Sequence, residues 1–331
     1  EFDVQTTQTW YVYLDGNFDN SANWTLDAST TPTYNNPSAE VPDAGDEVII
    51  YPGRSITMDV DDVNIDYIEV RGNLDLANTT GHNFNSINGN GIIRTSIDNF
   101  PAGVTDGAIG FGDPANGGTL VLEGTGDVTM AKPMTDANNR PLKNLRVNRD
   151  NSADKLILAA DFQFNGEIDL RSGDLQINDN SNTTPLLIEV LEDVSVDANA
   201  SMSVGTADAN DGLTGGTYGD YHRSFHTLRV GGDFTNEGSV RFTNQTEPAY
   251  DAYAPDGAVS LVFNRERDAK MDCRGTTDLY NLVLDKGADP TYELEVFASD
   301  RSHFALFGHN SNGSNDDGNN EEDHPEQQKA L

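Results

Sequence analysis

The sequence predicts an all-β protein, and more specifically a right-handed parallel β-helix, a solenoid with long polar corner loops. Apolar and polar residues alternate in short runs, as they do in half-buried strands, and Gly, Asn and Asp crowd the turns between them. One short-strand unit also recurs along most of the chain, which is typical of a solenoid. A β-sandwich array is the alternative, although sandwich strands are usually longer and more evenly spaced.

The stretch Val41–Leu76 shows the alternation most clearly. After a turn at Pro52–Gly53, apolar side chains fall on one face of the expected strands and polar side chains on the other. The apolar set is Ile68, Val70, Leu74 and Leu76, and the polar set is Glu69, Arg71, Asn73 and Asp75. Because successive strand residues point to opposite faces, we expect the first set to be buried and the second to face solvent.

Copies of this unit recur further along the chain. Residues 68–74, 188–194 and 228–234 share two apolar positions two residues apart, then a polar or glycine corner, then a third apolar position. Residues 144–147 and 281–284 form a second similar pair. A unit this short cannot bury its apolar face alone, so stacked units are expected to bury a continuous apolar column.

The domain organisation follows from these repeats. Residues 1–40 are expected to form an N-terminal cap region of strand and loop, with a strand at Thr9–Tyr13, and residues 41–307 the β-helix repeats. Residues 308–331 are expected to be a polar, acidic loop or tail, because residues 308–326 include no large apolar side chain. A solenoid needs a polar cap at each end, so we expect the natural chain to continue.

The net charge of the chain excludes some classes of partner and favours some surroundings over others. The 331 residues include 55 acidic and 20 basic side chains, which give a net charge of −35. Such a charge argues against nucleic acid, anionic membranes and anionic polysaccharides as partners. It favours solubility in a salty or extracellular setting, where screening weakens self-repulsion. Calcium is the one cofactor that the acidic residues suggest, and no run of residues is apolar enough for membrane insertion.

Two loops are candidate ligand-binding sites. Tyr218, Tyr221 and His222 lie in or just after a glycine-rich stretch, and Tyr250 and Tyr253 lie in a second aromatic stretch. Tyrosine rings can stack on pyranose faces, so both loops are candidates for binding a sugar. The alternative is that the tyrosines cover the apolar column as parts of ordered corner loops. A zinc site from His222 and His226 is the weaker idea, because the preceding glycines argue against the helix that this spacing needs.

Four aspartates in the organising stretch form the candidate metal site. Asp59, Asp61, Asp62 and Asp66 are close enough in sequence to share a calcium ion, since hard cations prefer oxygen ligands. Alternation with apolar neighbours sends Asp59 and Asp61 outward, so a solvated acidic face is the alternative. The spacing matches neither an EF-hand nor a glycine-rich calcium repeat.

No catalytic motif stands out in the sequence. There is no nucleophile elbow, phosphate-binding loop or dinucleotide fingerprint, and basic residues are few and scattered. The single cysteine, Cys273, allows no intramolecular disulfide and is expected to be a buried, inert thiol at the end of a strand.

One stretch resembles a known group of proteins. Asn23-Trp24, followed by a loop and then by VPDAGDEVII at Val41–Ile50, resembles the opening of repeat regions in very large secreted and adhesin-like surface proteins of Bacteroidetes-type bacteria. Residues 232–238 and 281–284 look like strand units of the same proteins. The resemblance implies an exported β-rich repeat segment of a longer, surface-displayed chain, and it implies no catalytic residues.

These observations favour a non-enzymatic, extracellular structural or adhesive segment of a larger bacterial cell-surface protein. Its partners would be other segments of the same large chain and surface glycans. The alternatives are a carbohydrate-active enzyme and a carbohydrate- or calcium-binding module on a β-helix.

Overall fold

The structure is a computed structural model that describes residues 7–101, 110–131, 142–181, 184–206, 226–244, 257–289 and 291–307. The protein is all-β with long parallel sheets, which confirms the predicted class. The chain divides into two compact units, and each is described by itself. The first unit is Glu1–Gly124 with Met134–Arg146, and the second is Thr125–Pro133 with Val147–Leu331.

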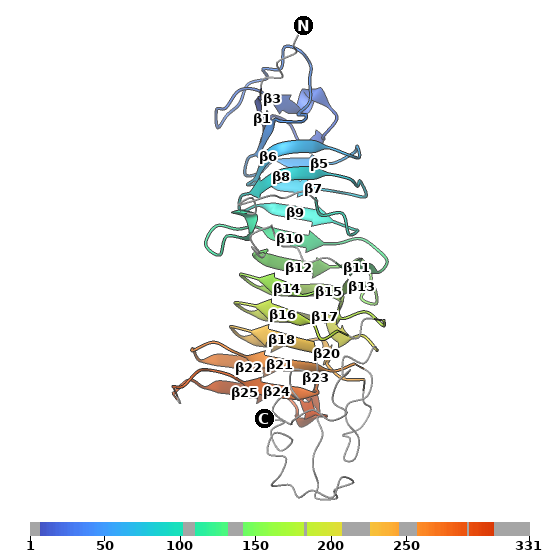
Figure 1. Ribbon diagram of the computed structural model, residues 1–331, viewed down its shortest axis with the longest axis vertical. Coiled ribbons are helices and arrows are strands. Elements are labelled where there is room, and N and C mark those ends of the chain that lie inside the picture. The colour runs from blue at the N-terminus through green and yellow to red at the C-terminus, as the bar shows by residue number, and fades with distance from the viewer. Residues whose placement is uncertain are drawn as a thin grey trace, which may run out of the picture. The chain divides into compact units, whose positions relative to one another are not determined.

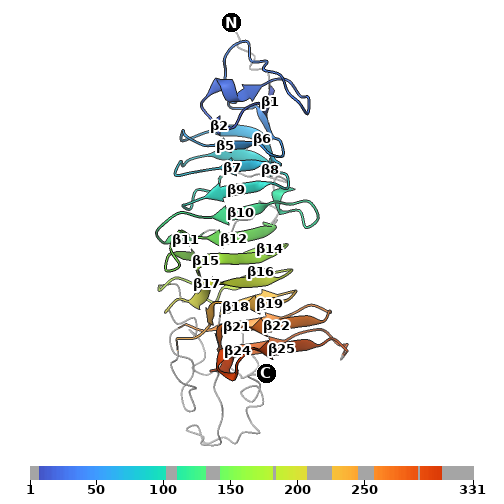
Figure 2. The same cartoon turned by 180° about the vertical axis from the view of Figure 1, so that it is seen from behind.

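The first unit contains short strands and two 3-10 turns. They are β1 (Thr9–Val12), β2 (Gly16–Asn17), η1 (Ser21–Asn23), β3 (Trp24–Thr25), β4 (Glu47–Ile50), β5 (Ser55–Thr57), β6 (Asn64–Val70), β7 (Asn73–Asp75), β8 (Asn83–Asn88), β9 (Ile92–Thr95), η2 (Gly110–Gly112) and β10 (Thr119–Leu122). The chain alternates between two sheets as it proceeds. Sheet A has the order β3-β1-β4-β6-β8, and sheet B contains the order β2-β5-β7-β9-β10 (Figures 1 and 2).

Parallel pairing dominates this unit. Strands β4, β6 and β8 pair in parallel, as do β5, β7 and β9, and β1 pairs in parallel with β4. The described pair β1–β3 is antiparallel. A parallel neighbour needs a crossover connection, so each strand must leave for the other sheet before the chain returns beside it. This pairing argues against a sandwich of antiparallel sheets.

Two apolar columns fill the space between these sheets. The column of sheet A is Trp10, Val48, Ile68 and Ile87, and that of sheet B is Ile56, Leu74, Ile93 and Leu120. None of these side chains is more than 1% exposed. The four apolar residues predicted to be buried in the organising stretch are all buried, so the period-two interpretation is confirmed there.

Glycines let neighbouring turns approach at the corner between the two sheets. A Cβ on Gly72 would lie 2.3 Å from the carbonyl oxygens of Tyr51 and Arg54 in the preceding turn. A Cβ on Gly91 would lie 2.2 Å from the carbonyl oxygen of Gly72. The corner therefore stacks backbone on backbone, which only glycine permits.

The region predicted as an N-terminal cap contributes strands to both sheets. Strand β1 pairs with β4, and β2 pairs with β5. Asp46 is 3% exposed and fixes this first turn, because it accepts hydrogen bonds from Trp10 Nε1 (2.8 Å), Gln8 N (2.9 Å) and Asp43 N (3.1 Å). Trp24 is fully buried and donates from Nε1 to the carbonyl oxygen of Phe18 at 2.7 Å.

The second unit arranges its strands on three sheets. Its strands are β11 (Val128–Met130), β13 (Lys155–Leu158), β14 (Phe162–Phe164), β15 (Ile168–Ile177), β16 (Leu187–Val190), β17 (Val194–Val204), β18 (His226–Val230), β19 (Phe234–Asn236), β20 (Ser239–Arg241), β21 (Val259–Phe263), β22 (Ala269–Cys273), β23 (Thr276–Leu279), β24 (Asn281–Leu284), β25 (Leu294–Ala298) and β26 (Ala305–Leu306), with a 3-10 turn η4 (Arg301–His303). Strand β12 (Asn144–Asn148) contains the boundary between the units.

Successive turns of the second unit place their strands on the same sheets. Sheet C has the order β14-β16-β18-β21-β24, and sheet D the order β15-β17-β19-β22-β25 (Figure 2). Sheet E takes β11 and β13, the later halves of β15 and β17, and then β20, β23 and β26. The long strand β15 serves both D and E because its register with β17 shifts between Leu170 and Ser172, where the strand turns the corner.

Each sheet of the second unit contributes an apolar column. The columns are Phe162, Ile188, Leu228, Leu261 and Leu282 in sheet C, Ile168, Val194, Phe234 and Met271 in sheet D, and Leu156, Leu175, Met202 and Val240 in sheet E. All of these side chains are buried. Cys273 ends β22 fully buried, as predicted, and burial raises the pKa of its thiol.

The three similar sequence units occupy equivalent places. Their first two apolar positions lie on β6, β16 and β18, and the third lies on the next strand, at Leu74, Val194 and Phe234. The length of a turn nevertheless varies. Asp66 and Asn85, hydrogen-bonded on adjacent turns, are 19 residues apart, whereas Asp193 and Asp233 are 40 residues apart. Insertions therefore leave the pairing of the columns intact.

Candidate functional site

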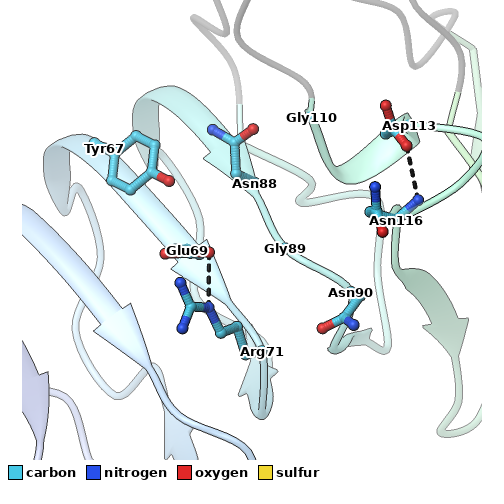
Figure 3. Close-up of a pocket in the computed structure, with 9 residues that line it drawn as sticks. All are labelled: Tyr67, Glu69, Arg71, Asn88, Gly89, Asn90, Gly110, Asp113 and Asn116. Carbon is cyan, nitrogen blue, oxygen red and sulfur yellow. Dashed lines mark hydrogen bonds and ion pairs between the residues drawn. The ribbon is translucent and has the colours of Figure 1, made fainter.

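A hollow of about 410 Å³ lies in the first unit, on the outer face of sheet A (Figure 3). Residues from β6, from the end of β8 and from the η2 turn surround it, and most of them are polar. They are Tyr67, Glu69, Arg71, Asn88, Gly89, Asn90, Gly110, Asp113 and Asn116. Its volume falls at the lower end of the range of small-molecule sites, which is roughly 300–1,000 Å³.

One wall is the outward row of β6. Ile68 and Val70 point into the core, so Tyr67, Glu69 and Arg71 must point outward on alternate positions. The row begins at an irregularity, because the backbone N–H groups of Asp66 and Tyr67 both donate to the carbonyl oxygen of Asp46, at 3.0 and 3.3 Å. The extra outward residue brings Tyr67 into the row that Glu69 and Arg71 continue.

Glu69 and Arg71 form an ion pair within this wall. Arg71 Nε donates to Glu69 Oε1 at 2.7 Å, with the two side chains 45% and 18% exposed. The hydrogen bond to Glu69 raises the pKa of the guanidinium, so Arg71 stays charged. Nε alone makes this bond, and no other described residue receives a hydrogen bond from Arg71. The terminal nitrogens are therefore available as donors.

Tyr67 gives the hollow an aromatic surface. It pairs in register with Ser86 on β8, and the ring is half-buried. Burial raises the pKa of the Tyr67 phenol, and the nearby carboxylate of Glu69 raises it further. The neutral phenol can donate and accept a hydrogen bond at neutral pH, while the ring offers an apolar face.

The opposite wall comes from β8 and the η2 turn. In Figure 3, Asp113 and Asn116 lie across the hollow from Glu69 and Arg71, with Asn88 and Asn90 between them. Asp113 Oδ1 accepts from the backbone N–H groups of Ala115 (2.9 Å) and Asn116 (2.7 Å), which holds the turn.

A glycine sets how close this turn comes to sheet A. A Cβ on Gly110 would lie 1.7 Å from Asn88 Oδ1, so a side chain at residue 110 would force the Asn88 carboxamide to move. Asn88 is itself held by a hydrogen bond from Nδ2 to Ser86 Oγ at 3.0 Å. The η2 turn and the end of β8 are therefore in close contact within the first unit.

The hollow can bind a polar ligand through many hydrogen bonds. Several hydrogen-bonding groups converge beside one aromatic ring. The carboxylate accepts hydrogen bonds, the guanidinium donates them, and the carboxamides do both. The charged side chains of the hollow leave a net charge of −1, since the two carboxylates of Glu69 and Asp113 outnumber the guanidinium of Arg71. Across the described ranges, no group of three or more His, Cys, Asp and Glu side chains is placed to hold a metal ion.

The four aspartates of the predicted calcium site make separate hydrogen bonds. Asp59 Oδ1 accepts from the backbone N–H of Asp19 (3.0 Å), and Asp61 Oδ1 accepts from that of Thr80 (2.7 Å). Asp66 Oδ1 accepts from Asn85 Nδ2 at 2.8 Å. Asp62 adopts a positive φ of 58° at a turn that packs against Gly81. All four are exposed, as a solvated acidic face would be, and calcium binding by them stays a prediction.

The predicted aromatic sites lie outside the described residues. This holds for Tyr218, Tyr221 and His222 and for Tyr250 and Tyr253, so sugar binding by these loops stays a prediction. His226 opens β18 and is fully buried, and its Nδ1 accepts from the backbone N–H of Leu186 at 3.0 Å. Burial lowers the pKa of His226 to about 4, so the ring is neutral at pH 7.

Sequence reasoning placed Glu69 and Arg71 on the polar face but did not single them out as a site. The signal was the row Tyr67, Glu69 and Arg71 at alternate positions of one strand, where three functional side chains share a face. Nothing in the sequence near them indicates Asp113 and Asn116, which reach the hollow from a later turn of the chain.

Comparison with family models, with curated proteins and with solved structures gives no match to this chain. Within the described ranges, no helix has the length and apolar character needed to cross a membrane.

Proposed function

We propose that the chain is a right-handed parallel β-helix that serves as a non-enzymatic structural and adhesive segment of a larger bacterial protein, secreted or held at the cell surface. The observation that carries the proposal is the repeated stacking of in-register apolar columns within each unit, at turn lengths that vary freely. A frame of this kind is stiff along the direction in which its strands stack. It can present loops that vary from one turn to the next.

The right-handedness of the proposed β-helix rests on general strand geometry. Each described turn passes from one parallel strand through a crossover to the next strand of the same sheet. Such connections are right-handed in about 98% of cases, because twisted strands pack back onto their sheet that way. A crystal structure of the chain would settle the hand, and a left-handed coil would refute this part of the proposal.

The proposed location and partners rest on charge and on resemblance. A net charge of −35 suits a salty extracellular medium, and Asn23-Trp24 with Val41–Ile50 resembles the opening of surface-protein repeats. In the structure, part of this motif contributes to the first turn, because Asp46 accepts from Trp10 on β1 and Trp24 donates to the carbonyl oxygen of Phe18. The proposed partners are other segments of the same large chain and surface glycans.

Antibodies raised against the purified chain test the location. We expect them to label intact, unpermeabilised cells of the source bacterium or its culture medium. Labelling that appears only after the cells are lysed would refute a secreted or surface location. An antibody against a cytoplasmic protein of the same cells serves as the control for lysis.

A carbohydrate-binding role is the second candidate function, and the polar hollow beside Glu69 and Arg71 favours it. Assays for released reducing ends on neutral and acidic glycans separate binding from catalysis. We expect no turnover, and turnover that a point variant in the hollow abolishes would assign an enzyme instead.

A further inference from the structure

We infer that the hollow formed by Tyr67, Glu69, Arg71, Asn88, Asp113 and Asn116 is a binding site for a neutral saccharide. The inference deepens the adhesive part of the proposed function, on which it rests, by naming the site and the class of ligand.

Charge selects a neutral ligand. The hollow carries one guanidinium against the two carboxylates of Glu69 and Asp113, in a chain whose acidic residues outnumber the basic ones by 55 to 20. An anion would enter a negative field, and its one attractive partner, Arg71, is already paired with Glu69 at 2.7 Å. A cation prefers several carboxylates together, and the described residues hold no group of three or more His, Cys, Asp and Glu side chains placed to bind one.

Hydrogen-bonding capacity selects a polyhydroxylated ligand. A sugar hydroxyl both donates and accepts, so it is best satisfied where an acceptor and a donor stand side by side. Glu69 and Arg71 provide this pairing on one wall, and the carboxamides of Asn90 and Asn116 provide it across the hollow (Figure 3). Because Arg71 Nε already donates to Glu69 Oε1 at 2.7 Å, the guanidinium is oriented before the ligand binds.

The aromatic ring completes the site. The C–H face of a pyranose is apolar, and Tyr67 offers a half-buried ring at the end of the row that holds Glu69 and Arg71. The outward row of sheet A continues beyond the hollow, since Glu69 pairs in register with Ile49, and Ile49 with Tyr11. Tyr11 is stacked on Tyr51, with ring centroids 5.7 Å apart. A chain of several sugars would therefore find further aromatic surface along the same face.

Titration calorimetry on the whole chain tests the inference, with a panel of neutral gluco-, manno-, galacto- and xylo-oligosaccharides as probes. We expect at least one of them to bind, and Arg71→Ala to weaken that binding by about tenfold or more, as loss of a charged hydrogen-bond donor does. Tyr67→Phe should retain the affinity, and Tyr67→Ala should lose it, because the ring supplies the stacking surface.

The chain offers a matched control for Arg71. Arg171 donates from Nε to Asp169 at 2.9 Å with side chains 50% and 16% exposed, so it repeats the same two-residue ion pair in the second unit. Arg171→Ala should leave saccharide binding unchanged. Equal losses in the two variants would overturn the assignment of the site to this hollow.

Three further outcomes decide the inference. Absence of binding by every oligosaccharide on the panel would overturn it, as would binding that survives both Arg71→Ala and Tyr67→Ala. The inference would also be overturned if the sugars gave no heat of binding while calcium alone gave heat that the Asp113→Asn variant lacked. The hollow would then be a calcium site. Since these measurements need no cells, failure here would leave the surface location standing, and failure of the cell labelling would leave saccharide binding standing.

Discussion

Asp46 shows how one carboxylate organises the start of the fold. It sits within the motif-like stretch Val41–Ile50, is almost fully buried, and accepts from one indole and two backbone N–H groups. A buried carboxylate is stable only when such donors surround it. Because Trp10 lies on β1, Gln8 directly precedes that strand and Asp43 belongs to the turn before β4, this side chain joins two turns of the first unit.

Replacing Asp46 should therefore destabilise the protein strongly. Asp46→Ala leaves two backbone N–H groups and the Trp10 indole without their acceptor, and we expect a loss of about 2–4 kcal/mol in the free energy of unfolding. Urea unfolding monitored by tryptophan fluorescence measures it. Asp66→Ala is the control, since it removes an exposed carboxylate with one bond to Asn85, and it should change stability by less than about 0.5 kcal/mol. Equal effects would show that Asp46 has no special role.

His226 should make stability depend on pH. Its pKa falls from 6.5 to about 4 in the folded chain because burial disfavours the charged ring. Between these values the unfolded chain binds more protons, so stability is fully present above about pH 6.5 and falls by about 3 kcal/mol as the pH drops to about 4. His82 acts in the same direction, because burial lowers its pKa too.

Comparing the wild type with His226→Gln separates the pH dependence that His226 contributes from the pH dependence that the many carboxylates contribute. Glutamine can accept from the backbone N–H of Leu186 but does not titrate. We expect the stability advantage of the wild type to shrink as the pH falls from 7 to about 4.5 in urea-unfolding curves. An advantage that stays constant over this range would contradict the predicted titration.

At the scale of the element, the apolar columns should carry most of the stability. Leu228 on β18 is fully buried between Ile188 and Leu261 of the neighbouring turns. We expect Leu228→Ala to cost about 2–5 kcal/mol, through lost apolar contact and the cavity left behind. Thr227→Ala, one residue earlier on the outward face, should cost less than about 0.5 kcal/mol. Chemical unfolding of both variants measures the difference, and similar costs would mean that the inside-outside assignment of β18 is wrong.

The strands were predictable because their determinants are local. Period-two alternation at Ile68, Val70 and Leu74 correctly identified the buried face, and the similar units at 188–194 and 228–234 correctly identified equivalent strands. The buried position of Cys273 followed from the same pattern. The strand β1 was predicted from its own residues, but β2 was not, because a two-residue strand has no periodicity to detect.

The candidate site could not be predicted in the same way. The hollow requires that the η2 turn come to lie against β8, where Gly110 packs beside Asn88. Nothing in the sequence around Gly110 or Asn88 indicates that the two residues come into contact. The outward row of β6 was visible in the sequence, but a row of polar side chains on a strand is the normal appearance of a solvated face.

At the scale of the whole molecule, the charge should make stability depend on salt. Carboxylates outnumber basic groups by 55 to 20, and their mutual repulsion is relieved when ions screen it. We expect the melting temperature to rise as NaCl is increased from about 20 mM to about 500 mM. Circular dichroism measures the melt. CaCl₂ at equal ionic strength is the comparison: an equal shift indicates screening alone, and a larger one indicates specific calcium binding. A melting temperature that falls with NaCl would contradict the prediction.

The in-register pairing of turns has a consequence for how such a chain can evolve. Ile68 pairs with both Val48 and Ile87, and hydrogen-bonded partners on β6 and β8 are 19 residues apart. If a genetic deletion removed one whole turn, Ile87 would take the place of Ile68 beside Val48, and Gly91 would take that of Gly72 at the corner. Duplication of a turn would do the reverse. A gene of this kind can therefore gain or lose length in whole turns by unequal recombination, while every remaining strand keeps the same residues inside and outside.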